Sequence, residues 1–118
     1  MAERLRVLVV EDEMAVALMI EDMLTDLGHE VVGIAMRLHQ GMGLAATAPL
    51  DIAILDVNLN GRMSFPIADL LAERGVPFVF ATGYGAAGVE DRYRDRALVV
   101  TKPFRLQDLQ SAIERAAH

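Results

Sequence analysis

Residues 5–12 read LRVLVVED, a short apolar run that ends in two adjacent acidic residues. The run from Leu5 to Val10 is rich in β-branched residues, which is typical of a strand buried on both faces in a parallel sheet. Similar runs recur at residues 31–35, 52–55, 76–81 and 97–100. We therefore expect five buried strands, of which Leu5–Val10 is the first.

The segments between these runs have the spacing of amphipathic helices. The apolar face of the first helix consists of Ala17, Ile20, Leu24 and Leu27, and that of the last consists of Leu106, Leu109, Ile113 and Ala116. Strand and helix alternate five times, and this order implies parallel strands joined by right-handed crossovers. The sequence therefore predicts an α/β fold, a doubly wound parallel sheet of five strands flanked by five helices.

Residues that typically end or cap helices agree with these boundaries. Gly28 follows the first helix, Pro49 closes the second, and Ser64 is placed to cap the third. The fourth helix, Ala86–Asp95, is the weakest, because it begins among glycines and has little apolar face. We expect it to be short or mobile.

Length and composition restrict the class of protein. The chain has 118 residues, 53% of them apolar and none of them cysteine, so we expect one domain over residues 1–118, without disulfides or cysteine-based metal sites. Its apolar runs are far shorter than the roughly 20 residues of a membrane span, and we place it in the cytoplasm. A net charge of −6 argues against nucleic acid as a partner.

Polar residues gather where the predicted strands end. Glu11 and Asp12 follow the first strand, Asp56 follows the third, Thr82 the fourth and Lys102 the fifth. In open α/β sheets the binding crevice lies beyond the carboxyl ends of the strands. We therefore expect three carboxylates, one hydroxyl and one ammonium group to converge at one edge.

Such a set of side chains favours phosphoryl transfer. Three close carboxylates repel one another unless a cation is bound, and Mg²⁺ prefers oxygen ligands together with substrate phosphate. Asp56 is the best candidate nucleophile, because a carboxylate can form an acyl phosphate while the metal and Lys102 neutralise charge.

Each of these residues taken alone has an ordinary structural explanation. Glu11 and Asp12 would cap a helix, Asp56 would belong to a turn, and Lys102 would be a solvated surface lysine. The functional interpretation depends on the joint arrangement, because complementary charges at four separate strand ends rarely arise by chance.

Four motifs give the chain a family resemblance: Val9-Val10-Glu11-Asp12-Glu13, Ile54-Leu55-Asp56-Val57-Asn58-Leu59, Phe80-Ala81-Thr82-Gly83 and Thr101-Lys102-Pro103-Phe104. In this order and spacing the sequence resembles the receiver domain of response regulators, the CheY-like proteins of two-component systems. The resemblance spans the whole chain and implies a flavodoxin-like fold with strand order 2-1-3-4-5.

The resemblance also implies roles for single residues. The Mg²⁺ ligands would be Glu11, Asp12, Asp56 and the backbone carbonyl of Asn58, and Asp56 would be phosphorylated. Thr82 would donate its hydroxyl to a phosphoryl oxygen, and Lys102 would pair with Asp56 or its phosphate. The peptide bond between Lys102 and Pro103 would be cis.

The stretch Phe80-Ala81-Thr82-Gly83-Tyr84-Gly85 is similar to the FATGUY group of receivers. These are often single-domain proteins that work with histidine kinases in alphaproteobacterial signalling. Many receivers carry a Tyr or Phe three residues before the lysine as a rotameric switch, and Val99 occupies that position here. An aromatic switch at this site is therefore excluded.

The resemblance implies a stand-alone response regulator that accepts a phosphoryl group from a sensor histidine kinase and signals to a downstream protein. It would not be an enzyme beyond assisting its own phosphorylation and dephosphorylation. A phosphatase that uses an aspartyl phosphate and an interaction module that is not phosphorylated remain alternatives. Gly83–Gly88 also matches the G-x-G-x-x-G pattern of dinucleotide-binding enzymes, but it follows the fourth strand instead of the first.

Overall fold

A parallel sheet of five strands forms the centre of the computed structural model, which describes residues 4–94 and 97–117. Its strands are β1 (Arg6–Val10), β2 (Glu30–Ala35), β3 (Ile52–Asp56), β6 (Phe78–Thr82) and β7 (Leu98–Thr101). They lie in the order β2-β1-β3-β6-β7, and every neighbouring pair is parallel. For the five predicted strands this is the order 2-1-3-4-5, so the predicted fold is confirmed.

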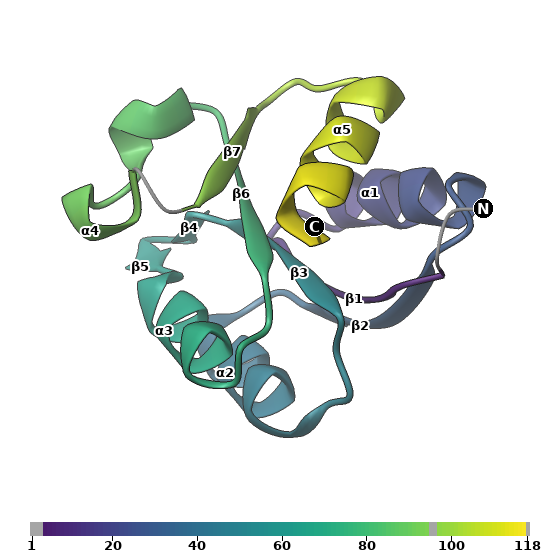
Figure 1. The fold of residues 1–118 in the computed structure, drawn as a ribbon. Helices are drawn as coiled ribbons and strands as arrows, with labels where there is room; N and C mark the ends of the chain where they lie inside the picture. The colour runs from purple at the N-terminus through teal and green to yellow at the C-terminus, as the bar shows by residue number, and fades with distance from the viewer. Residues whose placement is uncertain (1–3, 95–96, 118) are drawn as a thin grey trace.

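Helices cover both faces of the sheet (Figure 1). α1 (Met14–Asp26) and α5 (Leu106–Ala117) lie on one face, whereas α2 (Leu38–Thr47) and α3 (Phe65–Glu73) lie on the other. Successive strand residues point to opposite faces, and Val7 accordingly packs with α1 and α5 while Leu8 packs with α2 and α3. The core therefore has two halves, separated by the sheet.

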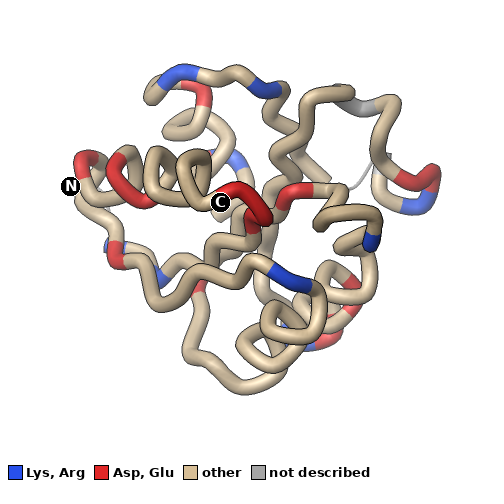
Figure 2. Tube along the Cα trace, turned by 180° about the vertical axis from the view of Figure 1, so that it is seen from behind, with Lys and Arg blue, Asp and Glu red and all other residues tan. Residues whose placement is uncertain are grey.

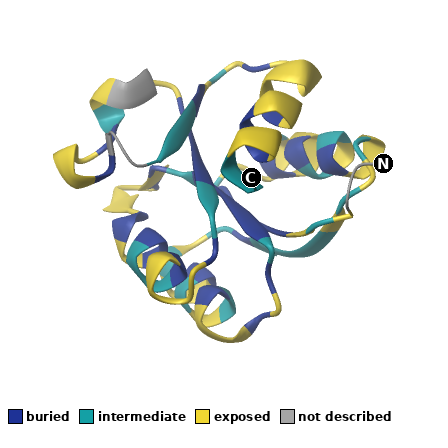
Figure 3. Ribbon diagram, viewed as in Figure 1, coloured by how far each residue is buried: buried dark blue, intermediate teal, exposed yellow. Residues whose placement is uncertain are grey.

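Figure 3 shows inner strands that are mostly buried, edge strands β2 and β7 that are largely of intermediate burial, and helices that are buried only on their inner sides. Ile20 and Leu24 on α1, and Leu109 and Ile113 on α5, are at most 2% exposed. These residues belong to the two predicted apolar faces. Among the described helices, none is both long and apolar enough to cross a membrane.

The segment of the predicted fourth helix is short, as expected. It contains a 3₁₀ turn, η1 (Gly85–Gly88), and a four-residue helix, α4 (Asp91–Arg94), while the predicted end at Asp95 lies outside the described residues. Its apolar side chains, Val89 and Tyr93, are 1% and 5% exposed. The Tyr93 ring lies 5.6 to 6.1 Å from the rings of Phe65, Phe78 and Phe80, so aromatic packing holds this short helix to the sheet.

An antiparallel hairpin follows Asp56 and was not predicted. It pairs β4 (Asn58–Leu59) with β5 (Arg62–Met63). Asn60 and Gly61 form its turn with φ angles of 54° and 93°, and Asn-Gly is a strong hairpin signal in a sequence. The hairpin projects from the edge of the sheet where the polar residues gather.

The predicted capping role of Ser64 is only half right. Ser64 occupies the N-cap position of α3, but its side chain makes no capping hydrogen bond. Its backbone has ψ near 3° instead of the extended conformation that aims a capping hydroxyl at the helix. The hydroxyl is buried and has no hydrogen-bond partner among the described residues.

Two glycines of α2 give a matched test of packing. A methyl group on Gly41 would lie 2.5 Å from Cδ1 of Ile67 in α3, whereas one on Gly43 would meet nothing within 4 Å. Alanine at either position gains about 1 kcal/mol of helix propensity, but overpacking costs about 1–3 kcal/mol. We expect Gly43→Ala to raise the free energy of unfolding, measured in urea. The free energy of unfolding of Gly41→Ala should be about 1–3 kcal/mol lower than that of Gly43→Ala. Equal stabilities would show that α2 and α3 are not in close contact.

Candidate functional site

The predicted site residues meet at the carboxyl edge of the sheet. Glu11 directly follows β1, Asp56 and Thr82 are the last residues of β3 and β6, and Lys102 directly follows β7. Asp12 stands beside Glu11 in the turn that leads to α1. The parallel register of four neighbouring strands thus brings together residues that are up to 91 positions apart in the sequence.

Three carboxylates lie in contact range at this edge. Glu11, Asp12 and Asp56 each offer one oxygen, and these oxygens lie within 4.8 Å of one another. The capping explanation for the first two is wrong, because α1 begins at Met14 with Glu13 at its N-cap. Both acidic residues stand before the helix, at the end of the strand.

Lys102, the one lysine of the chain, lies among these carboxylates. Its Nζ donates to Oε1 of Glu11 at 2.5 Å and lies 3.5 Å from Oδ2 of Asp56. The Glu11 side chain is 2% exposed, so this ammonium group is the cation that compensates a buried carboxylate. The sequence placed Lys102 beside the acidic residues but gave no sign that Glu11 would be its nearer partner.

The electrostatics of the site act most strongly on Asp56. Burial, and after it the charge of Glu11, raises the pKa of Asp56 to about 7. Burial alone would lower the pKa of Lys102, but its hydrogen bond to Glu11 and the charge of Asp56 outweigh that effect and raise it. The site therefore holds more negative charge than one ammonium group can balance.

This donor set fits a hard divalent cation. All three side chains offer carboxylate oxygens, which are ligands that Mg²⁺ prefers. Burial is the main cause of the raised pKa of Asp56, and repulsion from Glu11 and Asp12 adds to it, so a bound cation would lower that pKa. Glu11, Asp12 and Asp56 are therefore suited to hold Mg²⁺.

Asn58 remains a prediction as the fourth ligand. It begins β4, two residues after Asp56. Its side-chain oxygen accepts the N–H of Gly61 at 2.7 Å, so the amide group stabilises the hairpin. The role predicted for this residue concerns its backbone carbonyl.

Thr82 presents a buried hydroxyl at the same edge. Its side chain accepts the N–H of Tyr84 at 3.1 Å, which leaves the hydroxyl hydrogen free for donation. Its backbone carbonyl accepts the N–H of Lys102 at 2.8 Å. The peptide bond from Lys102 to Pro103 is cis, as predicted.

The remaining predicted positions lie around the site instead of in it. Tyr84 is 77% exposed and directly precedes η1, and Gly83 lies between it and Thr82. Val99 pairs with Phe80 across the sheet and packs in the half of the core that contains the aromatic rings. An aliphatic side chain therefore stands where an aromatic switch would be.

The family model described as "Response regulator receiver domain" matches residues 7–114. Among curated proteins, the transcriptional regulatory protein PdtaR of Mycobacterium tuberculosis is 32% identical over 114 residues, which are 94% of this chain and 56% of PdtaR. The probable chemotaxis protein CheY of Rhizobium etli is 30% identical, over 96% of this chain and 92% of that protein. This chain thus spans about half the length of PdtaR and nearly all of the CheY protein.

The fold also has close counterparts among solved structures. The solution structure of SdrG from Sphingomonas melonis Fr1 is 39% identical, covers both chains completely and superimposes with a TM-score of 0.87. A second solution structure, of the BeF3-activated conformation of SdrG, is 38% identical over 96% of each chain, with a TM-score of 0.81. Both structural matches include the ends of the strands, where the site residues lie.

Proposed function

This chain belongs to the family of response regulator receiver domains, and we propose that its Asp56 accepts a phosphoryl group from a histidine kinase in a Mg²⁺-dependent reaction. The observation that carries this proposal is the arrangement of Glu11, Asp12 and Asp56 around the ammonium group of Lys102. A receiver is a signalling phosphoacceptor, and we place this one in the cytoplasm.

The proposed reaction uses Asp56 as the nucleophile. A carboxylate oxygen of Asp56 attacks the phosphorus atom of the donor, the bond from phosphorus to the leaving group breaks, and the leaving group keeps the electron pair. The product is an acyl phosphate on Asp56. When bound, Mg²⁺ supplies charge neutralisation for the phosphoryl oxygens.

Lys102 and Thr82 complete the site from the neighbouring strands. Nζ of Lys102 lies 3.5 Å from Asp56, close enough to pair with an added phosphoryl oxygen after a small movement. The hydroxyl of Thr82 has a hydrogen to donate to another such oxygen. Charge-assisted hydrogen bonds of this kind are about twice as strong as neutral ones.

The test of the proposal is phosphorylation by a small acyl phosphate. We expect intact-mass spectrometry to show the addition of one phosphoryl group with acetyl phosphate and Mg²⁺, and none when EDTA replaces the metal. Phosphorylation that proceeds equally in EDTA would contradict a role for the carboxylate cluster as a metal site.

We propose that the signal leaves the site through the segment from Gly83 to Arg94, and that this is a receiver of the FATGUY type. Thr82 is joined directly to this segment, so a phosphoryl group that draws its hydroxyl inward would pull on η1. The segment is held at its other end, because Tyr93 donates a hydrogen bond to Asp69 of α3 and Arg92 pairs with the same carboxylate at 2.7 Å.

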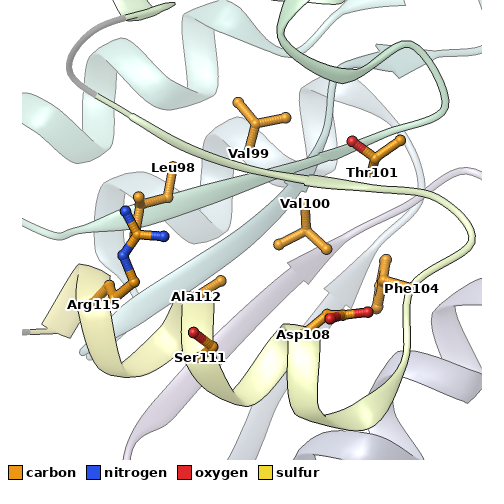
Figure 4. A pocket seen from close by; sticks show the side chains of 9 residues that line it. All are labelled: Leu98, Val99, Val100, Thr101, Phe104, Asp108, Ser111, Ala112 and Arg115. Carbon is orange, nitrogen blue, oxygen red and sulfur yellow. The ribbon is translucent and has the colours of Figure 1, made fainter.

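The surface that would change is formed by α4, β7 and α5. A cleft of about 360 Å³ lies between β7 and α5. In Figure 4, Val100 points from β7 into this cleft, while Val99 points to the opposite side. Val99 therefore faces the half of the core that contains Tyr93. A movement of α4 would reach β7 through this half of the core, and a downstream protein would read the change.

We expect the phosphoryl mimic beryllofluoride to change amide hydrogen exchange between Gly83 and Arg94, because glycines and short helices lower the local stability of this segment. The inner strands β1 and β3 serve as internal controls, since the sheet should retain its protection. Unchanged exchange in this segment, with clear changes elsewhere, would show that the signal takes another route.

We also propose that the chain acts in the manner of single-domain regulators. Two similarities support this proposal. The match to SdrG extends over all of this chain and all of the SdrG chain, and the match to the CheY protein extends over 92% of that protein. Such a regulator acts by binding a downstream protein or by draining phosphoryl groups from its kinase.

A further inference from the structure

A cleft of about 610 Å³ opens beside the carboxylate of Asp12. Its walls come from the turn between β2 and α2 and from the β4–β5 hairpin. The lining residues that matter are Asp12, Arg37, His39, Leu59, Asn60 and Arg62. Because Asp12 also belongs to the carboxylate cluster, the cleft adjoins the proposed phosphorylation site at this residue.

Two arginines give this cleft an unusual charge. Arg37 and Arg62 are both exposed, and neither makes an ion pair or side-chain hydrogen bond with any residue in the described ranges 4–94 and 97–117. Other arginines are engaged: Arg6 pairs with Asp51, and Arg74 donates to two backbone carbonyls of α2 and its end. In a chain of net charge −6, these two free guanidinium groups outnumber the one carboxylate, that of Asp12, which lines the same cleft, so the cleft is locally positive.

The backbone reinforces the positive character of the cleft. Arg37 is the N-cap residue of α2 and makes no side-chain capping bond. The first intrahelical bond runs from the N–H of Gly41 to the carbonyl of Arg37, so the N–H groups of Leu38 and His39 have no partner within the helix. Helix N-termini carry partial positive charge, and this one faces the same cleft as the two arginines.

Charge is distributed differently over the rest of the molecule. Figure 2 shows acidic residues on many parts of the surface, with the basic positions scattered between them. An anionic phosphodonor approaching Asp56 therefore meets a chain of net negative charge and a cluster of three carboxylates. Positive groups at the entrance increase the rate of association of an anion and orient it.

We propose that this cleft binds an anionic group, carboxylate or phosphate, that the phosphodonor carries next to the phosphoryl group it transfers. The inference rests on the proposed function, since it assigns a substrate feature to the same site. The guanidinium groups of Arg37 and Arg62 bind such a group by paired hydrogen bonds. The cleft is large enough for the whole leaving group of a small donor or for an acidic side chain beside a phosphohistidine.

The experiment compares donors with and without the additional charge. Acetyl phosphate is compared with succinyl phosphate, which carries a free carboxylate that acetyl phosphate lacks. A phosphohistidine peptide flanked by glutamines is compared with one flanked by glutamates. Rates of Asp56 phosphorylation are measured with Mg²⁺ at low ionic strength. The proteins are the natural chain, the double variant Arg37→Gln/Arg62→Gln, and Arg115→Gln.

Arg115 is the matched control, because it lines the separate cleft between β7 and α5. We expect the additional carboxylate to accelerate phosphorylation of the natural chain about threefold to tenfold, the size of one or two exposed ion pairs. The acceleration should disappear in the double variant and persist in Arg115→Gln. A gain confined to succinyl phosphate identifies a small donor, and one confined to the glutamate peptide identifies a protein donor.

An equal rate for charged and uncharged donors would overturn the inference, as would an acceleration that persists in the double variant. Either result leaves the proposed function standing, because phosphorylation itself is still observed. Failure of every donor to phosphorylate the natural chain would instead overturn the proposed function and the inference with it.

Discussion

Asp56→Asn will take no phosphoryl group from acetyl phosphate, and in metal-free buffer at pH 8 it will be more stable than the natural chain. The first effect follows from the loss of the attacking oxygen at the position where the three carboxylates and Lys102 meet. The second follows from the pKa of Asp56, which burial and the charge of Glu11 raise from 3.8 to about 7.

The sign of the second effect follows from proton binding. Between pH 3.8 and about 7 the folded protein keeps a proton on Asp56 that the unfolded chain has lost, so folding becomes less favourable as the pH rises through this window. Each unit of difference between the two pKa values corresponds to about 1.4 kcal/mol. Because the side chain is 12% exposed and solvent screens its charge, we expect a total of about 2 kcal/mol.

Urea unfolding of both proteins from pH 4 to pH 8 in EDTA measures this effect. The advantage of Asp56→Asn should shrink as the pH falls and vanish near pH 4, and millimolar Mg²⁺ should reduce it at pH 8 by binding the natural chain more tightly. Asp22→Asn, on the exposed side of α1, is the matched control and should show no such trend. A natural chain that is as stable as Asp56→Asn at pH 8 would contradict the electrostatic account.

Lys102→Met will destabilise the metal-free protein by about 3 kcal/mol, because it leaves the buried carboxylate of Glu11 without its cation. Breaking a buried ion pair from one side costs more than the pair contributes, since the remaining charge stays out of water. Adding Glu11→Gln should therefore restore most of the lost stability, although the double variant has lost both charges.

Arg105→Met provides the control from the same turn. Arg105 is 78% exposed and lies 3.9 Å from its partner Asp108, so its removal should have little effect on the free energy of unfolding. All proteins are compared by urea unfolding at pH 7 in EDTA. If Arg105→Met costs as much as Lys102→Met, or if Glu11→Gln brings no recovery, the pair of Glu11 and Lys102 does not stabilise the fold as described.

The sheet could be predicted from the sequence because its inner strands β1, β3 and β6 are buried on both faces, whereas the edge strands β2 and β7 are only partly buried. Runs such as Val7–Val10 are apolar at every position, which distinguishes inner parallel strands from the helical spacing of residues such as Ile20 and Leu24. The strand order, by contrast, came from the family resemblance. Local patterns in a chain do not specify which strands become neighbours.

The members of the candidate site could be predicted for a related reason. Once the strands are parallel, the residues after them share one edge, and Glu11, Asp56 and Lys102 need no further information to be brought together. Their pairing within the site could not be read in advance. The preference of Lys102 for Glu11 depends on differences of about one ångström, which the sequence pattern does not contain.

Two features were not predicted correctly, the β4–β5 hairpin and the direction of the Ser64 side chain, and both have local causes. The hairpin after Asp56 has strands of two residues each, too short for an alternating pattern, although Asn60-Gly61 was a readable turn signal. The hydroxyl of Ser64 does not cap α3, because the backbone conformation at the N-cap position turns it into the core. Residue type alone predicted the position of the helix start but not the direction of the side chain.

The hydrogen bond from the N–H of Lys102 to the carbonyl of Thr82 has a consequence for how the protein would encode a signal. The two residues that would contact the phosphoryl group are tied together through their backbones, so neither strand end can adjust far without the other. A phosphoryl group that displaced one of them would displace the other, so Thr82 and Lys102 would respond as one unit. The arrival of a single group would thus be felt at two strand ends at once, and β6 and β7 would carry the same message.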